Sequence, residues 1–289
     1  MLATYLQIVV NGLALGSFYV LLALGFSLIF GMTHAFNLAH GELILLSGYL
    51  AYGLWKSVGL PFYWTIPLCL VLLPPVTLIL NRLLARLPAP FELHSLVLTF
   101  GLAIVLQNLF LAGFSADFRL VVLPAEGFSG GAMFPIFLTL NQVLLLGLSL
   151  LGVAAMYLLL HHTFLGRALR ATIQNREAAA LAGIRVERLR LVAFALGGVL
   201  IGLAGPLWAA NMYLYPAAGT EATLIAIIIT IAAGVGRTRA LIVCGWLLGL
   251  AEAAGIWFWG SSWRELISGL VLLAILLWRF RDGEGVEGR

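Results

Sequence analysis

Charged residues are scarce in this 289-residue sequence: they make up 10% of it, whereas apolar residues make up 62%. Soluble domains carry about 25% charged and about 45–50% apolar residues, so this balance excludes an ordinary soluble protein. The sequence also lacks the short alternating segments of a membrane β-barrel, because its apolar residues form continuous runs. Such runs, at about 20 residues per crossing, predict an all-α protein that crosses a membrane several times.

Lysine and cysteine are almost absent, which limits the chemistry available to the chain. The single lysine, Lys56, follows Trp55, whereas the P-loop of an ATPase needs a lysine directly after a glycine. An HExxH motif is missing as well, so we predict that the chain is not an enzyme and does not hydrolyse ATP itself. The two cysteines, Cys69 and Cys244, fall in apolar runs, which favours packing over a disulfide or a metal site.

The apolar runs predict eight or nine membrane-spanning helices within one domain that covers residues 1–289. The run at 222–235 is short and is typical of a broken or tilted helix. The predicted spans are 5–30, 40–55, 62–81, 91–113, 136–160, 190–209, 222–235, 240–259 and 265–279.

The basic residues are concentrated in every second loop. Six arginines lie between Arg167 and Arg190, and others follow the third, seventh and ninth spans. Because basic loops stay in the cytoplasm, the C-terminus is predicted inside and the N-terminus outside. The net charge of +4 therefore reflects orientation in a lipid bilayer and not a nucleic-acid partner. On this topology 114–135 is an external loop, and 280–289 is a short charged tail that we expect to be poorly ordered.

The longest polar stretch, 161–190, carries helical periodicity. Alanines supply good helix formers, and Gly183 stands where a helix ends in a left-handed residue. The pattern predicts a cytoplasmic amphipathic helix over 164–182; the alternative is a solvated loop that only orients the protein. The residues at helical spacing on its polar face are Arg167, Arg170, Gln174 and Glu177.

A second polar segment lies between the first two spans and holds Asn37, His40 and Glu42. Polar groups at membrane depth line a cavity or pack inside protein, and ionisable ones indicate a functional site. The alternative is a hydrated turn at the membrane edge. Three further polar residues interrupt apolar runs, and interhelical hydrogen bonding explains them at least as well as substrate contact: Gln107, Asn108 and Glu252.

Four Gly-xxx-Gly pairs are present: Gly12/Gly16, Gly127/Gly131, Gly198/Gly202 and Gly245/Gly249. Such pairs permit close helix approach in lipid. With 32 glycines in 289 residues, chance predicts about as many, so we give them no functional weight.

Three blocks of sequence form a recognisable pattern. The first is Gly25-Phe-Ser-Leu-Ile-Phe-Gly31 followed by Asn37-Leu-Ala-His-Gly41. The second is Leu98-Thr-Phe-Gly-Leu102 with Leu106-Gln-Asn108. The third runs from Thr163-Phe-Leu-Gly-Arg-Ala-Leu-Arg-Ala171 through Asn175 and Ala180-Leu-Ala-Gly-Ile184 to the helix that holds Leu196-Gly197 and Gly205. Together they resemble the permease subunit of the high-affinity branched-chain amino acid ABC importer family, in which the end of the first block usually reads Asn-Phe-Ala-His-Gly.

The resemblance implies a multi-pass subunit of a bacterial or archaeal plasma (inner) membrane. Its implied partners are a second, homologous permease, two cytoplasmic ATPases and an extracytoplasmic substrate-binding protein. The chain itself would bind no cofactor, since ATP and Mg are held by the ATPases. The third block would be the coupling helix, with coupling residues Gly166, Arg167, Arg170, Asn175, Glu177 and Gly183. The candidates for the translocation path or gate are Asn37, His40, Glu42, Gln107, Asn108 and Glu252.

Departures from the family pattern leave other substrates open. The usual glycine-rich turn before proline is replaced by Ala233-Gly-Val-Gly-Arg-Thr-Arg-Ala240, and the usual C-terminal ending is replaced by 279–289. Related permeases carry urea, short amides or other amino acids. An ion-coupled secondary transporter is a further alternative. It would need membrane-embedded carboxylates to bind the coupling ion, and Glu42 and Glu252 are the candidates.

Overall fold

The computed structural model describes residues 2–123, 127–129 and 137–260, and beyond these residues 263, 266–267, 269–271, 273–274 and 277. The predicted tail at 280–289 lies outside the described residues. So do parts of the predicted loop at 114–135 and of the predicted span at 265–279.

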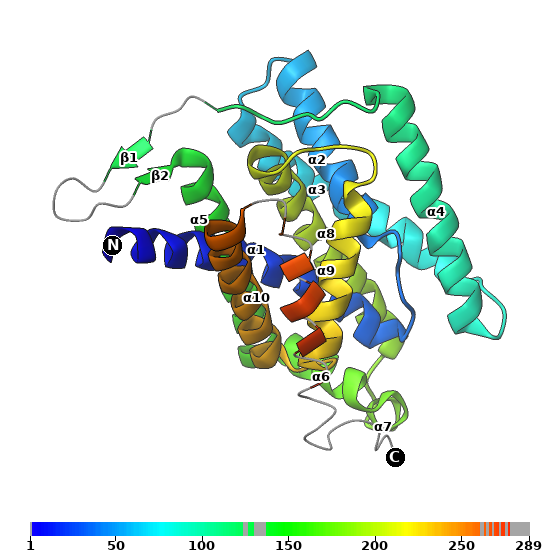
Figure 1. Ribbon diagram of the computed structural model, residues 1–289. Helices are drawn as coiled ribbons and strands as arrows, with labels where there is room; N and C mark the ends of the chain where they lie inside the picture. The colour runs from blue at the N-terminus through cyan, green and yellow to red at the C-terminus, as the bar shows by residue number, and fades with distance from the viewer. Residues whose placement is uncertain are drawn as a thin grey trace.

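The described chain is almost entirely helical, with one two-stranded antiparallel hairpin (Figure 1). The hairpin strands are β1 (Gly127–Ser129) and β2 (Phe137–Thr139). The helices are α1 (Leu2–Thr33), α2 (His40–Ser57), α3 (Phe62–Leu84), α4 (Phe91–Phe114), α5 (Leu140–His162), α6 (Phe164–Gln174), α7 (Arg176–Leu181), α8 (Val186–Asn211), α9 (Ala218–Ala233) and α10 (Thr238–Trp259).

The predicted all-α polytopic architecture is confirmed. Each of the first eight predicted spans coincides with one helix, and the boundaries differ by four residues or fewer. Among the described residues, six helices are long and apolar enough to cross a membrane alone: α1, α3, α4, α5, α8 and α10. The predicted short span is α9, with 16 residues; α2 is more polar and carries Glu42 and Lys56.

Helix α1 lies at the centre of the bundle and packs against α5, α8, α9 and α10 (Figure 1). Its contact with α10 depends on small residues. A Cβ added at Gly16 would stand 2.8 Å from the Cα of Trp246, and one added at Gly249 would meet the backbone of Gly16. The Gly-xxx-Gly pairs of these two helices therefore serve close backbone packing, the role such pairs have in lipid.

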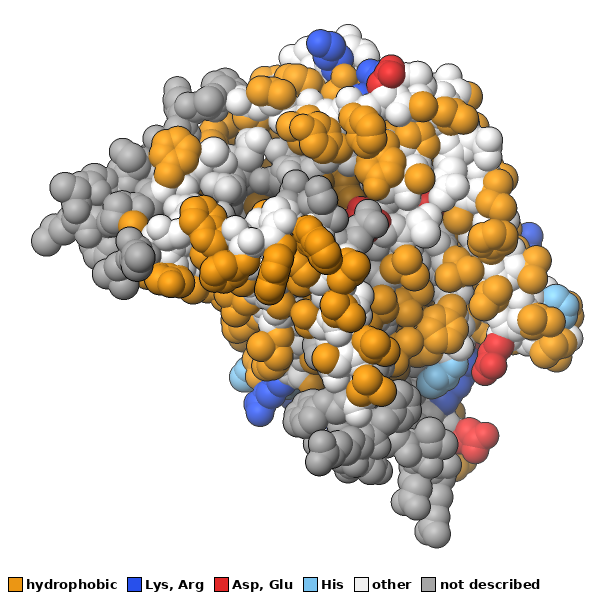
Figure 2. Space-filling view, viewed as in Figure 1, with side chains coloured by type: hydrophobic (Ala, Val, Ile, Leu, Met, Phe, Trp, Pro, Cys, Tyr) orange, Lys and Arg blue, Asp and Glu red, His pale blue; other side chains and the backbone are white. Residues whose placement is uncertain are grey.

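The outer surface has the distribution expected of a protein in a bilayer. Figure 2 shows hydrophobic side chains across the middle of one face, with most of the coloured charged side chains toward its upper and lower ends. Helix α4 contributes much of this apolar surface, since Val97, Phe100 and Leu109 are each more than half exposed. Among the helices, α4 packs mainly against α2.

Candidate functional site

The chain between α1 and α2 folds back beside α1. We call residues 34–39 the return segment. His34 has a left-handed φ of 54°, and His40 then places its Nε2 atom 3.2 Å from the carbonyl oxygen of Leu22. Leu22 precedes the end of α1 by eleven residues, or roughly 16 Å along the helix. Helix α2 therefore begins inside the bundle, next to the middle of α1.

Side chains from α4, from α9 and from the segment itself satisfy the non-helical backbone of the return segment. The amide of Leu38 donates to Thr99 Oγ1 at 3.2 Å, and Thr223 Oγ1 donates to the Leu38 carbonyl at 3.4 Å. The Asn37 carboxamide oxygen accepts from the amide of Ala39 at 3.1 Å. Irregular backbone at membrane depth needs such partners. The segment is thus fixed in place by α4 and α9.

The first turns of α2 and α9 meet at this point. The amide of Gly41 donates to Thr223 Oγ1 at 2.8 Å. A Cβ at Gly41 would collide with the carbonyl oxygen of Gly219, and a Cβ at Gly219 would collide with the carboxylate of Glu42. Both glycines are therefore required for this approach of two helix N-termini, whose partial positive charge favours an acidic group nearby.

Glu42 is the acidic group at that junction. Gln107 Nε2 on α4 donates to Glu42 Oε1 at 2.7 Å and also lies 3.2 Å from Thr220 Oγ1 on α9. We call these three residues the Glu42 cluster. It draws one polar side chain from each of α2, α4 and α9.

The alternative of a hydrated turn is wrong, because Asn37, His40 and Glu42 are only 2%, 1% and 1% exposed. Each also has one buried polar atom without a hydrogen-bond partner among the described residues: Asn37 Nδ2, His40 Nδ1 and Glu42 Oε2. Unpaired buried polar atoms are rare and costly. This part of the bundle therefore has donor and acceptor atoms available for a further hydrogen-bonding partner.

The other predicted path residues lie elsewhere. Asn108 follows Gln107 in α4 but is exposed, and its side chain donates to the carbonyl of Ile104 in its own helix. Glu252 is fully buried between α10 and α1, where it accepts a 2.7 Å hydrogen bond from the hydroxyl of Tyr19. Of the six predicted path residues, the structure brings Gln107 into direct contact with Glu42.

The predicted single helix over 164–182 is wrong: the segment forms two helices, α6 and α7, that meet at Asn175. This residue is extended, with φ −153°, and its side chain accepts from the amide of Ala178. The Asn175 side chain is thus an N-cap that starts a second helix. Thr163 caps α6 in the same way by accepting from the amide of Gly166. The left-handed end at Gly183 is confirmed, with φ 82°.

The two arginines predicted for coupling face different ways. Arg167 and Glu177 are exposed. Arg170 instead lines a small cavity of about 20 Å³ with residues of α1, α5 and the start of α10. Two apolar side chains on the same surface are strongly exposed, Phe164 at 78% and Leu181 at 90%. Helices α6 and α7 therefore present a mixed apolar and basic surface outward, while Arg170 touches the spans.

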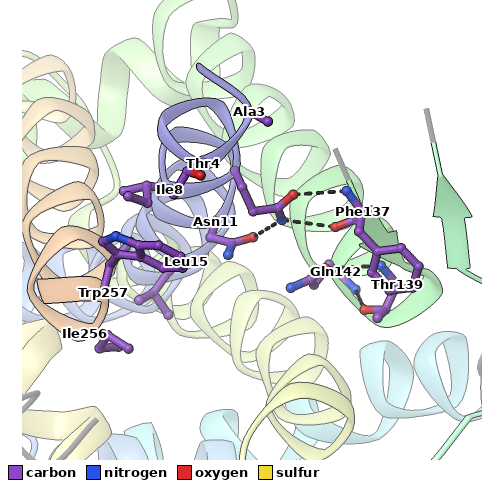
Figure 3. Close-up of a pocket in the computed structure, with 12 residues that line it drawn as sticks. Ala3, Thr4, Ile8, Asn11, Leu15, Phe137, Thr139, Gln142, Ile256 and Trp257 are labelled. Atoms are coloured by element: carbon purple, nitrogen blue, oxygen red, sulfur yellow. Dashed lines mark hydrogen bonds between the residues drawn. The ribbon is translucent and has the colours of Figure 1, made fainter. Parts of the chain in front are cut away.

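A pocket of about 700 Å³ lies at the other end of the bundle (Figure 3). Its wall combines the start of α1, β2, the start of α5 and the end of α10. Several of its polar groups form hydrogen bonds within the wall: the Gln7 side chain pairs with the backbone of Phe137, and Gln142 caps α5 with Thr139. None of the predicted site residues lines this pocket.

Sequence reasoning missed Gly219, Thr220 and Thr223, which complete the site. The predicted span started at 222, so the first turn of α9 was assigned to a loop. A polar residue at 220 and another at 223, three positions apart at the start of an apolar run, is the signal that marks a polar face on this turn.

Comparisons with known proteins agree with this architecture. Residues 8–276 match the family described as "Branched-chain amino acid transport system / permease component". The high-affinity branched-chain amino acid transport system permease protein BraD of Pseudomonas aeruginosa is 26% identical, over 99% of this chain and 96% of its own length. LivH of Escherichia coli K12, with the same description, is also 26% identical, over 94% and 93%. The autoinducer 2 import system permease protein LsrC of Escherichia coli is 34% identical over 48% of this chain and 44% of its own length.

Proposed function

The chain belongs to the branched-chain amino acid transport permease family, and on that basis we propose that it forms the translocation path of an ATP-driven importer. Substrate would be delivered by an extracytoplasmic binding protein, and two cytoplasmic ATPases would supply the energy. A second, homologous permease would complete the membrane part. The observation that carries this proposal is the family match over residues 8–276.

We place the gate of the path at the return segment and the Glu42 cluster. Two helix N-termini and the buried groups Asn37, His40 and Glu42 gather there. Discontinuous helices that start at membrane depth, with unpaired polar groups beside them, are a recurring way to build a solute site in transporters. Asn108 and Glu252 stay candidates for the path, through the exposed face of α4 and the α1–α10 interface.

The ATPases would dock on α6 and α7. Exposed Phe164 and Leu181 offer apolar contacts that nothing in the described chain covers, and Arg167 and Glu177 offer polar ones. Gly166, Asn175 and Gly183 shape this surface, since they permit or fix its turns. Arg170 lies against α1, α5 and α10. It would transmit a movement of α6, caused by the ATPases, to these spans.

The basic segments support an inner-membrane location with this surface in the cytoplasm. The end of α3 and Arg176 and Arg190 line one pocket, and Arg170 shares another with Gly236. Three basic loops far apart in the sequence thus meet at one end of the bundle, as the positive-inside rule requires of a cytoplasmic face. The N-terminus would then lie outside and the C-terminus inside.

We propose branched-chain amino acids as the substrates, because two relatives aligned over nearly their whole length, BraD and LivH, carry that description. Another small polar solute is the second candidate, since LsrC is described as an autoinducer 2 import permease.

The test is uptake of labelled leucine into vesicles that hold the chain together with its permease, ATPase and binding-protein partners. The proposal expects uptake that requires ATP and the binding protein. Uptake driven by an ion gradient in vesicles of the chain alone would contradict it and favour a secondary transporter. Uptake of another solute that also requires ATP and the binding protein would change the proposed substrate but leave the proposed mechanism in place.

A further inference from the structure

A small pocket at the basic end of the bundle has the chemistry of an anion site. Its volume is about 140 Å³, and it is lined by residues at the ends of several helices, two of which are arginines. A water molecule occupies about 30 Å³ in the liquid, so the pocket holds a group of a few heavy atoms. The lining residues are Thr33, Leu84, Ala85, Leu87, Phe91, Arg176 and Arg190.

The two arginines converge on the pocket from different helices. Glu187 holds both, with Arg176 Nη2 at 2.8 Å from one carboxylate oxygen and Arg190 Nη2 at 3.2 Å from the other. The Glu187 side chain is 65% exposed and therefore lies toward solvent. One carboxylate cannot neutralise two guanidinium groups, so a net positive charge stays beside the pocket.

Arg190 also has an unused donor there. Its side chain is only 17% exposed, and its Nε atom is buried without a hydrogen-bond partner among the described residues. A buried N–H of a charged group is costly to leave unpaired. A bound anion would satisfy it, and arginine forks fit the oxygens of a phosphate particularly well.

We propose that this pocket binds a phosphoryl oxyanion through Arg176 and Arg190. The pocket lies between the ends of α3 and α4, two of the candidate spans, and the neighbouring side chains Leu83 and Leu93 are exposed and apolar. A pocket at that position is open to the headgroup of an anionic lipid, and basic pockets between spans on the cytoplasmic side bind such headgroups. Free phosphate shares the same chemistry, and the experiment separates the two sources.

The test uses the full-length chain in nanodiscs of phosphatidylcholine with increasing fractions of phosphatidylglycerol. Thermal unfolding is followed by tryptophan fluorescence, because a ligand that binds the folded state raises the Tm. The wild-type Tm should rise with the anionic fraction and saturate. Arg190→Gln and Arg176→Gln should each weaken the effect about tenfold in lipid fraction, the cost of losing a charge-assisted hydrogen bond. A second arm adds inorganic phosphate to phosphatidylcholine nanodiscs, with chloride at equal ionic strength as control; a saturable rise in this arm alone identifies free phosphate as the ligand.

Two matched variants separate anion binding from a structural ion pair. Arg188→Gln removes an exposed arginine of α8 that does not line the pocket, so the rise in Tm should persist. Glu187→Gln removes the competing carboxylate, so binding should persist or tighten. If Glu187→Gln abolishes the rise as Arg190→Gln does, the arginines only support an ion pair and the proposal is wrong. It is equally wrong if neither lipid nor phosphate raises the wild-type Tm.

Discussion

The carboxamide of Gln107 on α4 donates a 2.7 Å hydrogen bond to the carboxylate of Glu42 in the first turn of α2. The two residues are 65 positions apart in the chain. Their contact attaches α4, which otherwise exposes most of its apolar surface, to the point where the return segment and α9 meet. A displacement of α4 would therefore displace Gln107 and alter the Glu42 cluster directly.

Replacing Gln107 tests this attachment. Gln107→Leu leaves the buried carboxylate of Glu42 without its donor, which costs about 1–3 kcal/mol. We expect a lower Tm of the purified chain and a strong loss of uptake in the reconstituted importer. Asn108→Leu is the matched control, because Asn108 is exposed and bonds only within its own helix. Equal losses in the two variants would show that the Glu42 contact carries no special role.

The close approach of α2 and α9 makes a second prediction. A methyl group at position 219 would collide with the carboxylate of Glu42, and overpacking of this kind costs about 1–3 kcal/mol. Gly219→Ala should therefore lower the Tm and reduce uptake. Gly101→Ala on α4 meets nothing within 4 Å and should leave the Tm unchanged or raise it, since alanine favours a helix over glycine by about 0.5–1 kcal/mol. The assignment of the α2–α9 junction fails if both variants behave alike.

These residues show where sequence reasoning reaches its limit. Continuous apolar runs located the spans, because length and hydropathy are local properties, and Gly183 was placed by a local rule. The pairing of Gly41 with Gly219 could not be predicted, since it depends on which helices meet. The split at Asn175 was missed because alanines on both sides favoured one long helix, whereas the Asn175 side chain accepts from the amide of Ala178 and caps a new one.

The Gly-xxx-Gly pairs are a case in which sequence reasoning gave too little weight to a feature. Their number matched chance, so composition gave no reason to distinguish them. In the structure Gly16 lies against Trp246 and Gly249 at the α1–α10 contact, and Gly198 and Gly202 lie against α3. At each of these positions a larger side chain would collide with the neighbouring helix, which the number of pairs in the sequence could not show.

The orientation of the chain is a third prediction, tested with single cysteines. Leu181→Cys stands at the basic end and Lys56→Cys at the opposite end, and both side chains are exposed. In intact cells a membrane-impermeant maleimide should label Lys56→Cys alone, and Leu181→Cys should react only after the membrane is opened. The parent chain is the control for the two native cysteines, of which Cys69 is buried and Cys244 is partly exposed. Labelling of Leu181→Cys in intact cells would reverse the proposed topology.

The exposed apolar side chains of α6 and α7 make a fourth prediction. Leu181→Ser should change the free energy of unfolding by no more than about 0.5 kcal/mol, because the side chain is 90% exposed. It should nevertheless weaken copurification of the ATPases, since apolar anchors at the centre of an interface contribute about 1 kcal/mol or more each. Val58→Ser, 69% exposed at the opposite end, is the control. Undiminished copurification of Leu181→Ser would exclude α7 from the docking surface.

The last prediction concerns the two arginines of α6, because the structure places them in different surroundings. Arg167 is exposed, so Arg167→Ala should weaken binding of the ATPases and reduce uptake and ATP hydrolysis together. Arg170 lines a cavity with residues of α1, α5 and the start of α10, so Arg170→Ala should leave binding intact. ATP hydrolysis in the assembled importer should then continue while uptake falls, because the docked helix no longer holds the spans through its guanidinium. Measuring copurification, ATPase rate and uptake on each variant distinguishes the two positions, and an Arg170→Ala importer with normal uptake per ATP hydrolysed would show that coupling passes through other residues.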